Sequence, residues 1–288
     1  MTAFLFPGQG SQKRGMGQDL FDVVREYAVL EKDIDALLGY SLRKLCLEDK
    51  DNLLKETQYT QPSLYVINAL YYFKAKTAGE TPSYLAGHSL GEYNALLAAG
   101  CFDFLTGLRL VKKRGELMSR ARNGGMAAVV GLDSRKIATI VQSEGLTSID
   151  IANFNSPSQI VLSGPVEAIN RAGPIFEKAG ARLFMPLPVS AAFHSRYMAD
   201  AARAFSDFLS PMVFLAPKTP VIANVTAAPY PIENASDALK SLLVRQITSP
   251  VQWVDTIRYM ASKGNSQFKE TGPGAVLTRL VQQIQSEA

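Results

Sequence analysis

Ser89 lies in the segment GHSLG (87–91), which has the G-x-S-x-G spacing of a nucleophile elbow. In such an elbow a sharp strand-to-helix turn exposes the serine hydroxyl, and main-chain N–H groups face the oxyanion that forms on attack. The apolar segment 83–87 predicts the strand, and 92–100, which ends at a glycine, predicts the helix. This context favours nucleophilic catalysis by Ser89 over a glycine-rich turn that merely contains a serine.

A serine nucleophile needs a base, and the chain contains two histidines, His88 and His194. His88 adjoins Ser89, but successive side chains diverge around a tight turn, so its ring does not reach the hydroxyl at about 2.6–3.2 Å. We expect His88 to pack beneath the turn. His194 follows the last strand of a predicted inserted subdomain, where a chain that crosses between domains lines a cleft. His194 is therefore predicted to be the base.

Arg114 lies on the apolar stripe of a helix predicted within 105–122, because its neighbours three and four positions away are all apolar. Lys112 and Lys113, on the same helix, are expected to face solvent. A buried guanidinium needs an anionic or hydrogen-bonding partner, since a stranded charge costs several kcal/mol. Spacing alone leaves two partners open, namely a fixed protein carboxylate or a carboxylate on a bound substrate.

The segment FPGQGSQKRGMG (6–17) invites comparison with a phosphate-binding loop. Met16 and Gly17 stand where that loop requires lysine and then serine or threonine, and Lys13 occupies the third glycine position of G-x-G-x-x-G. We expect no nucleotide site here. The turn instead suits a second loop that supplies a main-chain N–H to an oxyanion.

Composition excludes several other classes of protein. The 288 residues have a net charge of +4 without a basic stripe, so no nucleic-acid site is predicted. No apolar run approaches the roughly 18 residues of a membrane span, and the first residues do not resemble a signal peptide. Two widely separated cysteines and two histidines predict no zinc site and are typical of a reducing cytoplasm. The mild positive charge would suit a phosphate-bearing ligand or an acidic partner.

The segment 125–189 differs in pattern from the rest of the chain. It predicts a strand, a helix, two strands, a helix interrupted by Pro174, and a last strand. This β-α-β-β-α-β order is the ferredoxin-like pattern. We therefore predict that a small subdomain, residues 125–189, is inserted into a large α/β domain formed by 1–124 and 190–288. Further strands are expected at 4–6 and 220–225, and a helix at 62–76.

These motifs together resemble the malonyl-CoA:acyl-carrier-protein transacylase family, the acyltransferases of fatty-acid and polyketide synthesis. The resemblance runs through nearly the whole chain. Its motifs, in order, are FPGQGSQ, TQPSLY, GHSLGEY, LVKKRGELM, GGMAAVVGL, NFNSPSQIVLSG, FHS, RQITSPVQW and TGPGAVLTRL. In FDFLTGLRLVKKRGELM (102–118) the chain is most similar to the discrete, trans-acting enzymes that serve polyketide synthases. Nothing else in the chain suggests a fused ketosynthase or carrier domain, so it is expected to act alone.

The resemblance implies a role for each matching residue. Ser89 would carry the acyl group and His194 would be its base, while the main-chain N–H groups of Gln9 and Leu90 would form the oxyanion hole. Arg114 would bind the malonyl carboxylate. The FHS tripeptide, through Phe193, is associated with malonyl preference, since methylmalonyl-selective relatives tend to carry serine there. The main-chain carbonyl of Gln246 would orient the histidine.

The resemblance also implies the fold and the partners. The fold would be a hydrolase-like α/β domain with a parallel sheet and a ferredoxin-like insert. The partners would be malonyl-CoA, as a substrate, and an acidic phosphopantetheinylated acyl carrier protein, with no metal or redox cofactor. A hydrolase that releases acyl groups from carrier proteins is the nearest alternative, and a degenerate, non-catalytic docking subunit is the second. A buried arginine argues against the first and an intact Ser89, His194 and Arg114 against the second.

Overall fold

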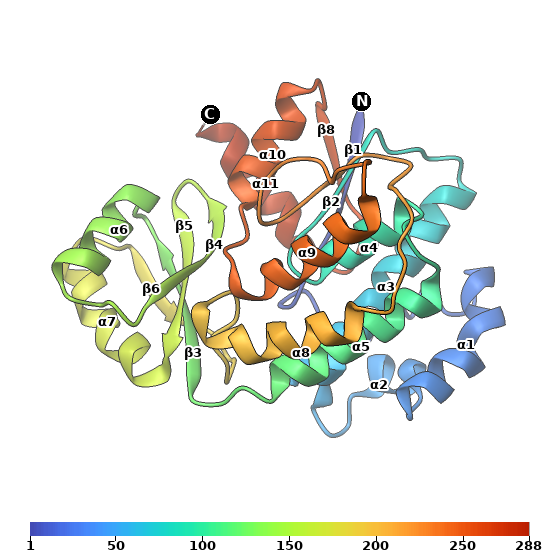
Figure 1. Cartoon of the computed structure of the whole chain (residues 1–288), viewed down its shortest axis with the longest axis horizontal. Helices are drawn as coiled ribbons and strands as arrows, with labels where there is room; N and C mark the ends of the chain where they lie inside the picture. The colour runs from blue at the N-terminus through green and yellow to red at the C-terminus, as the bar shows by residue number, and fades with distance from the viewer. Residues whose placement is uncertain (288) are drawn as a thin grey trace.

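A computed structural model describes residues 1–287, so that Ala288, the last residue of the predicted large domain, lies outside it. The α-helices have the following bounds: α1 Arg25–Leu38, α2 Leu42–Glu48, α3 Thr57–Thr77, α4 Gly91–Ala98, α5 Phe104–Ser119, α6 Ser134–Ser143, α7 Val166–Lys178, α8 Ala199–Leu209, α9 Ala235–Thr248, α10 Trp253–Ser262 and α11 Val276–Ser286. The strands are β1 Thr2–Phe6, β2 Tyr84–Gly87, β3 Gly124–Val130, β4 Asp150–Ser156, β5 Gln159–Pro165, β6 Leu183–Pro186, β7 Val221–Ile222 and β8 Gln267–Glu270. The chain forms two units that lie side by side (Figure 1).

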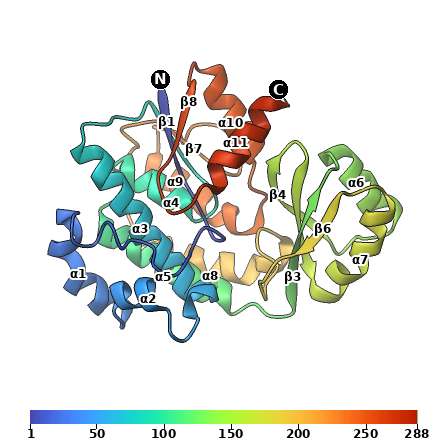
Figure 2. The same cartoon turned by 180° about the vertical axis from the view of Figure 1, so that it is seen from behind.

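The larger unit is built on a parallel sheet with the strand order β7-β2-β1-β8. Alternate residues of β1 enter different hydrophobic clusters, as expected for a strand with both faces covered. Phe4 and Phe6 pack with residues of α3 and α4, whereas Ala3 and Leu5 pack with residues of α10 and α11. Figure 2 shows the sheet between these helices. Strand β7 is shorter than the predicted 220–225, because the chain leaves the sheet after Ile222.

The smaller unit contains an antiparallel sheet with the order β4-β5-β3-β6. Helices α6 and α7 bury apolar residues with this sheet, among them Ile137, Ile169 and Phe176. The predicted β-α-β-β-α-β order is therefore present, and with this strand order the unit is ferredoxin-like. The two ends of the unit meet, because the N–H of Gly124 donates to the carbonyl of Ser190 at 3.2 Å.

The predicted interruption of α7 by Pro174 was wrong, since the helix continues through the proline. Proline removes one helical hydrogen bond and frees the carbonyl four residues earlier, here that of Asn170. Both Pro174 and Asn170 lie on the exposed side of the helix. Water can therefore satisfy the freed carbonyl, and the buried side of α7 keeps its packing on the sheet.

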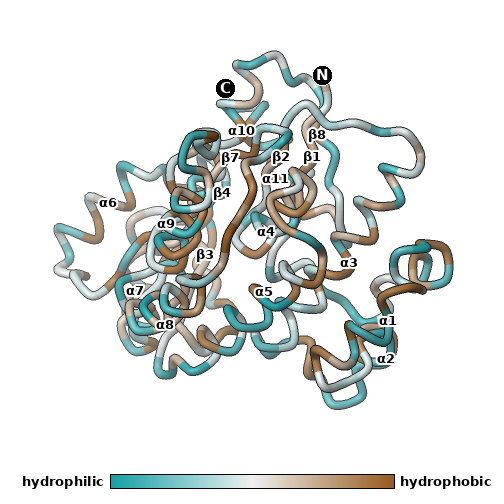
Figure 3. Tube along the Cα trace, turned by 45° about the vertical axis from the view of Figure 1, so that its right-hand side comes forward, coloured by the Kyte–Doolittle hydropathy of each residue, from teal (hydrophilic) through white to brown (hydrophobic). Residues whose placement is uncertain are grey.

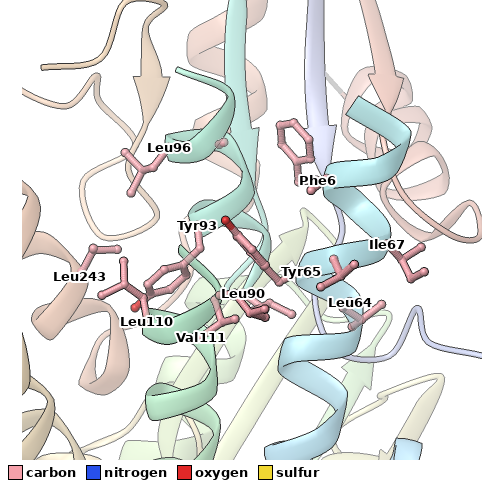
Figure 4. Packing of buried hydrophobic residues seen from close by; sticks show 14 of the residues in the cluster. Phe6, Leu64, Tyr65, Ile67, Leu90, Tyr93, Leu96, Leu110, Val111 and Leu243 are labelled. Atoms are coloured by element: carbon pink, nitrogen blue, oxygen red, sulfur yellow. The ribbon is translucent and has the colours of Figure 1, made fainter. Parts of the chain in front are cut away.

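Helices α3, α4 and α5 form the apolar support beneath the elbow (Figure 4). Tyr65 of α3, Tyr93 of α4 and Leu110 of α5 are fully buried against one another, together with Leu90 of the elbow. Along α8 and α9 the hydropathy alternates, as expected for helices with one buried face (Figure 3). No helix in residues 1–287 combines the length and the apolar character needed to span a membrane.

Candidate active site

Ser89 lies in a sharp turn between the end of β2 and the start of α4, and its φ of 51° is in the left-handed region. A side chain is strained at such a φ, which marks a turn held by its surroundings. The flanking glycines are required for close packing, because a Cβ on Gly87 would lie 1.9 Å from the carbonyl carbon of Gly91. Asn224 closes the turn: its Oδ1 accepts from the N–H of Ser89 and its Nδ2 donates to the carbonyl of Gly87, both at 2.7 Å.

His194 is the histidine that reaches the serine, with its Nε2 2.8 Å from Oγ of Ser89. Its Nδ1 lies 2.8 Å from the main-chain oxygen of Gln246. A carbonyl oxygen only accepts hydrogen bonds, so Nδ1 carries the proton and Nε2 is free to accept the serine proton. Burial, followed by the charge of Arg114, lowers the pKa of His194 to about 3. The imidazole is therefore neutral at physiological pH, and the lone pair of Nε2 is available to the serine hydroxyl.

His88 points away from the serine hydroxyl, as the turn geometry predicted. Its Nε2 lies 2.8 Å from Oδ1 of Asn155, and its ring packs edge-on against Trp253 with 5.3 Å between centroids. Burial lowers the pKa of His88, so this ring is neutral as well. Its contacts are those of a packing residue beneath the elbow.

Arg114 is buried, with 1% of its surface exposed, and its guanidinium lies directly beside the serine. Nη2 donates to Oγ of Ser89 at 3.1 Å and to Oε1 of Gln246 at 2.8 Å. Its Nε is buried and has no hydrogen-bond partner within residues 1–287. Lys112 and Lys113, which were expected to face solvent, are half-buried. The arginine thus retains donor capacity beside the hydroxyl of Ser89.

A cavity of about 100 Å³ adjoins the hydroxyl of Ser89. Gln9 and Leu90 both line it, and neither main-chain N–H donates to another group among the described residues. Two such free donors beside a nucleophile can stabilise an oxyanion. Phe193 lines the cavity with its buried side chain. The site residues predicted from the sequence thus surround one cavity or, in the case of Gln246, hydrogen-bond to its walls.

A second hollow, of about 600 Å³, adjoins the cavity and shares Val189 and Phe193 with it. Lys55, Arg122 and Glu56 lie on its walls, so basic side chains outnumber acidic ones there by one. This small excess of positive charge suits a substrate whose long arm carries phosphate groups.

Sequence reasoning missed Glu92 and Asn224, although both contact the site. Glu92 is 1% exposed and Asn224 is fully buried. A signal existed for Glu92, because it stands in the first turn of an apolar helix that packs inside the domain. No signal existed for Asn224, because it follows Ser89 by 135 residues and comes beside the elbow only when the chain folds back.

Comparisons with known proteins identify the family to which the chain is similar. Residues 3–288 match the family described as "Acyl transferase domain". The chain is 53% identical to Polyketide biosynthesis protein ThaF of Burkholderia thailandensis over 99% of its length, but it spans only 24% of that relative. It is 52% identical to Polyketide biosynthesis malonyl CoA-acyl carrier protein transacylase BaeC of Bacillus velezensis, covering 100% of this chain and 98% of the relative.

A solved structure is also similar over the whole chain. The crystal structure of malonyl CoA-acyl carrier protein transacylase from Burkholderia pseudomallei superposes with a TM-score of 0.93 at 48% identity. The likeness covers 100% of this chain and 99% of that one. The fold class inferred from the sequence, a parallel-sheet α/β domain with a ferredoxin-like insert, is thereby confirmed. The chain belongs to the acyl transferase domain family.

Proposed function

We propose that this protein transfers a malonyl group from malonyl-CoA to the phosphopantetheine thiol of an acyl carrier protein through a malonyl-serine intermediate. The observation that carries this proposal is the buried Arg114, whose guanidinium lies 3.1 Å from Oγ of Ser89. A cation at that point selects an acyl group with a free carboxylate. The relative BaeC, at 52% identity, is named for the same activity.

In the first half-reaction Oγ of Ser89 attacks the thioester carbonyl while Nε2 of His194 takes the hydroxyl proton. The main-chain N–H groups of Gln9 and Leu90 stabilise the oxyanion. Collapse of this intermediate forms the malonyl-serine ester and releases coenzyme A, whose sulfur receives the proton from His194. The carbonyl of Gln246 keeps the imidazole in the required tautomer throughout.

In the second half-reaction the pantetheine thiol of the carrier protein gives its proton to His194 and attacks the ester. The oxyanion forms again, and its collapse returns the proton to Oγ of Ser89. These steps need no metal or redox cofactor, because the nucleophile, base and oxyanion donors all come from the chain. The net charge of +4 suits an acidic carrier protein.

The names of the relatives favour polyketide synthesis over fatty-acid synthesis as the pathway that this chain serves. We place the reaction in the cytoplasm, which is supported by two free, buried cysteines, Cys46 and Cys101. We also propose the domain division 1–124 with 190–288, and 125–189. It is supported by the hydrogen bond between Gly124 and Ser190, which brings the ends of the insert together.

A carrier-protein hydrolase would use Ser89 and His194 equally, with water in place of the second thiol. Arg114 argues against this reading, because an enzyme that removes neutral acyl chains has no use for a buried cation. The transacylase name of the relative BaeC likewise gives the hydrolase no support.

The deciding experiment is intact-protein mass spectrometry with malonyl-, methylmalonyl- and acetyl-CoA, followed by addition of phosphopantetheinylated carrier protein. We expect a malonyl adduct that disappears as the carrier protein gains the same mass. Release of free malonate, with no gain by the carrier, would instead establish a hydrolase. No adduct with any of the thioesters would refute catalysis by this chain.

Arg114→Ala should lower the rate of malonyl acylation by about 100-fold, because a buried charge-assisted contact to the substrate carboxylate is lost. Acetyl acylation should persist or rise, since acetyl has no carboxylate. Rapid-quench measurement of both acylation rates tests this expectation. Lys113→Ala removes a charge from the same helix outside the cavity and should change neither rate. An equal loss of both activities in Arg114→Ala would make the arginine a structural residue.

The low pKa of His194, about 3, predicts how the reactivity of Ser89 depends on pH. A base stays active above its pKa, so reaction with phenylmethylsulfonyl fluoride, an uncharged serine reagent, should hold a constant rate from pH 8 down to pH 5. A histidine with the ordinary pKa of about 6.5 would lose about 30-fold over that range. Because Glu92, with a pKa of about 7, also titrates in this range, the measurement is repeated with Glu92→Gln, whose side chain does not titrate. A decline with its midpoint near pH 6.5 in both proteins would show that the base is not the buried imidazole described here.

A further inference from the structure

Gln246 is fully buried, and its side-chain amide is hydrogen-bonded at both ends. Oε1 accepts from Nη2 of Arg114 at 2.8 Å. Nε2 donates to the main-chain oxygen of Ser89 at 2.8 Å and to the carboxylate of Glu92. One amide therefore connects the nucleophile, the arginine and a buried acid.

The chemistry of the two charged neighbours allows only one orientation of this amide. A guanidinium only donates hydrogen bonds, and an ionised carboxylate only accepts them. If the amide turned over, its NH₂ group would face Arg114 and its oxygen would face Glu92, so both contacts would become repulsive. Glu92 thus holds the amide oxygen toward Arg114.

Glu92 is itself firmly placed in the first turn of α4, three residues after Ser89. Besides the amide of Gln246, its Oε1 accepts from the hydroxyl of Tyr230 at 2.6 Å and from the N–H of Asn224 at 3.1 Å. Burial raises the pKa of Glu92 to about 7, while these donors and the charge of Arg114 favour the ionised form. Above neutral pH the acid is a fixed, buried anion.

Arg114, by contrast, has no direct carboxylate partner among the described residues. Within residues 1–287 no carboxylate oxygen lies within 4.0 Å of its guanidinium. A buried charge without compensation is strongly destabilising. Two groups offset the buried charge of Arg114. Its guanidinium lies 5.6 Å from the centre of the Tyr93 ring, and the carboxylate of Glu92 reaches it through the amide of Gln246. This arrangement leaves the guanidinium without a direct anionic contact that would block a substrate carboxylate.

We propose that Glu92 is a positioning residue for acyl selection: acting through Gln246, it holds the guanidinium of Arg114 against the hydroxyl of Ser89, where the malonyl carboxylate binds. The inference rests on the proposed function and deepens it. In a Ser-His-Asp triad the acid is directed at the histidine. Here Nδ1 of His194 bonds to the main-chain carbonyl of Gln246. The acid, Glu92, is directed instead at Arg114, through the side-chain amide of Gln246.

The test is the ratio of malonyl to acetyl acylation rates in Glu92→Gln, measured by rapid quench at pH 8, where Glu92 is ionised in the parent protein. A glutamine at position 92 can meet either orientation of the Gln246 amide, so Arg114 loses its fixed acceptor. We expect malonyl acylation to fall at least about tenfold and acetyl acylation to fall less than about threefold. Both substrates use the same serine and histidine, so the ratio reports the arginine alone.

Two comparisons separate positioning from general stability. Tyr230→Phe removes another buried hydrogen bond from the same carboxylate but leaves Gln246 in place, and the ratio should stay at the parent value. In an Arg114→Ala background, Glu92→Gln should no longer change the ratio. A tenfold selective loss that persists in that background would overturn the proposal, because Glu92 would then act without Arg114.

An equal fall for both substrates in Glu92→Gln, or an unchanged ratio, would also overturn it. Should Glu92→Gln fail to fold, Gln246→Met removes the connecting amide but keeps the main-chain carbonyl that orients His194. It should show the same selective loss, and an unchanged ratio there would refute the proposal. Failure of the proposed function is distinguishable, since the parent protein itself would then form no malonyl adduct.

Discussion

Ser89→Ala should abolish the malonyl adduct, with acylation falling by about 10⁴-fold or more, because Ser89 carries the one hydroxyl among the described residues that line the cavity. Alanine is sterically no worse than serine at a φ of 51°, so the elbow should keep its shape. Intact-protein mass spectrometry after incubation with malonyl-CoA measures the loss directly. Binding of malonyl-CoA should persist in calorimetry, since Arg114 remains.

The matched control for this variant is Ser163→Ala. Ser163 is fully buried in β5, outside the cavity, and its hydroxyl has no partner among the described residues. Its replacement should leave the adduct intact. An adduct that survives in Ser89→Ala would require another nucleophile and would refute the assignment of the elbow serine.

Exchange of the two histidines for alanine should give opposite results. His194→Ala removes the group 2.8 Å from Oγ of Ser89, and acylation should fall by about 10³-fold, as expected for loss of a general base. His88→Ala removes a ring that contacts Asn155 and Trp253, so it should lower the melting temperature while most acylation activity remains. Single-turnover acylation and thermal melting measure the two effects separately.

The reverse outcome would contradict the assignment. If His88→Ala abolished acylation while His194→Ala spared it, the adjacent histidine would be the base despite its orientation. If both variants lost activity in proportion to their loss of folded protein, neither histidine would have a demonstrated chemical role.

Elements with strong periodicity could be predicted from the sequence. The alternation of strands and helices in 125–189 gave the order of the insert, because each element there has a clear apolar face. Strand β8, with the polar sequence QFKE, was not predicted, since it lies at the edge of the sheet and only Phe268 enters a core cluster. Strand β7 ends early because Asn224, two residues after it, bonds to the elbow instead of continuing the sheet.

The same distinction applies to the site. The elbow motif is local, and Arg114 could be placed by its helical neighbours, so both were accessible to sequence reasoning. The partner of Arg114 was not, because spacing left a protein carboxylate and a substrate carboxylate equally open. In the structure the acid Glu92 does not touch Arg114 directly but is linked to it through the side-chain amide of Gln246. Such relays join residues more than 130 positions apart and have no local signal.

The hydrogen bond between Gly124 and Ser190 also affects the entropic cost of bringing the Ser89–His194 dyad together. The dyad residues, Ser89 and His194, are 105 positions apart in the chain. Once the small sheet has formed and its ends are joined, the segment that must close is only about 40 residues, which lowers the entropic cost of closure by about 0.9 kcal/mol. The insert therefore shortens the segment whose closure brings Ser89 and His194 together, and this closure costs less entropy than their separation in the sequence implies.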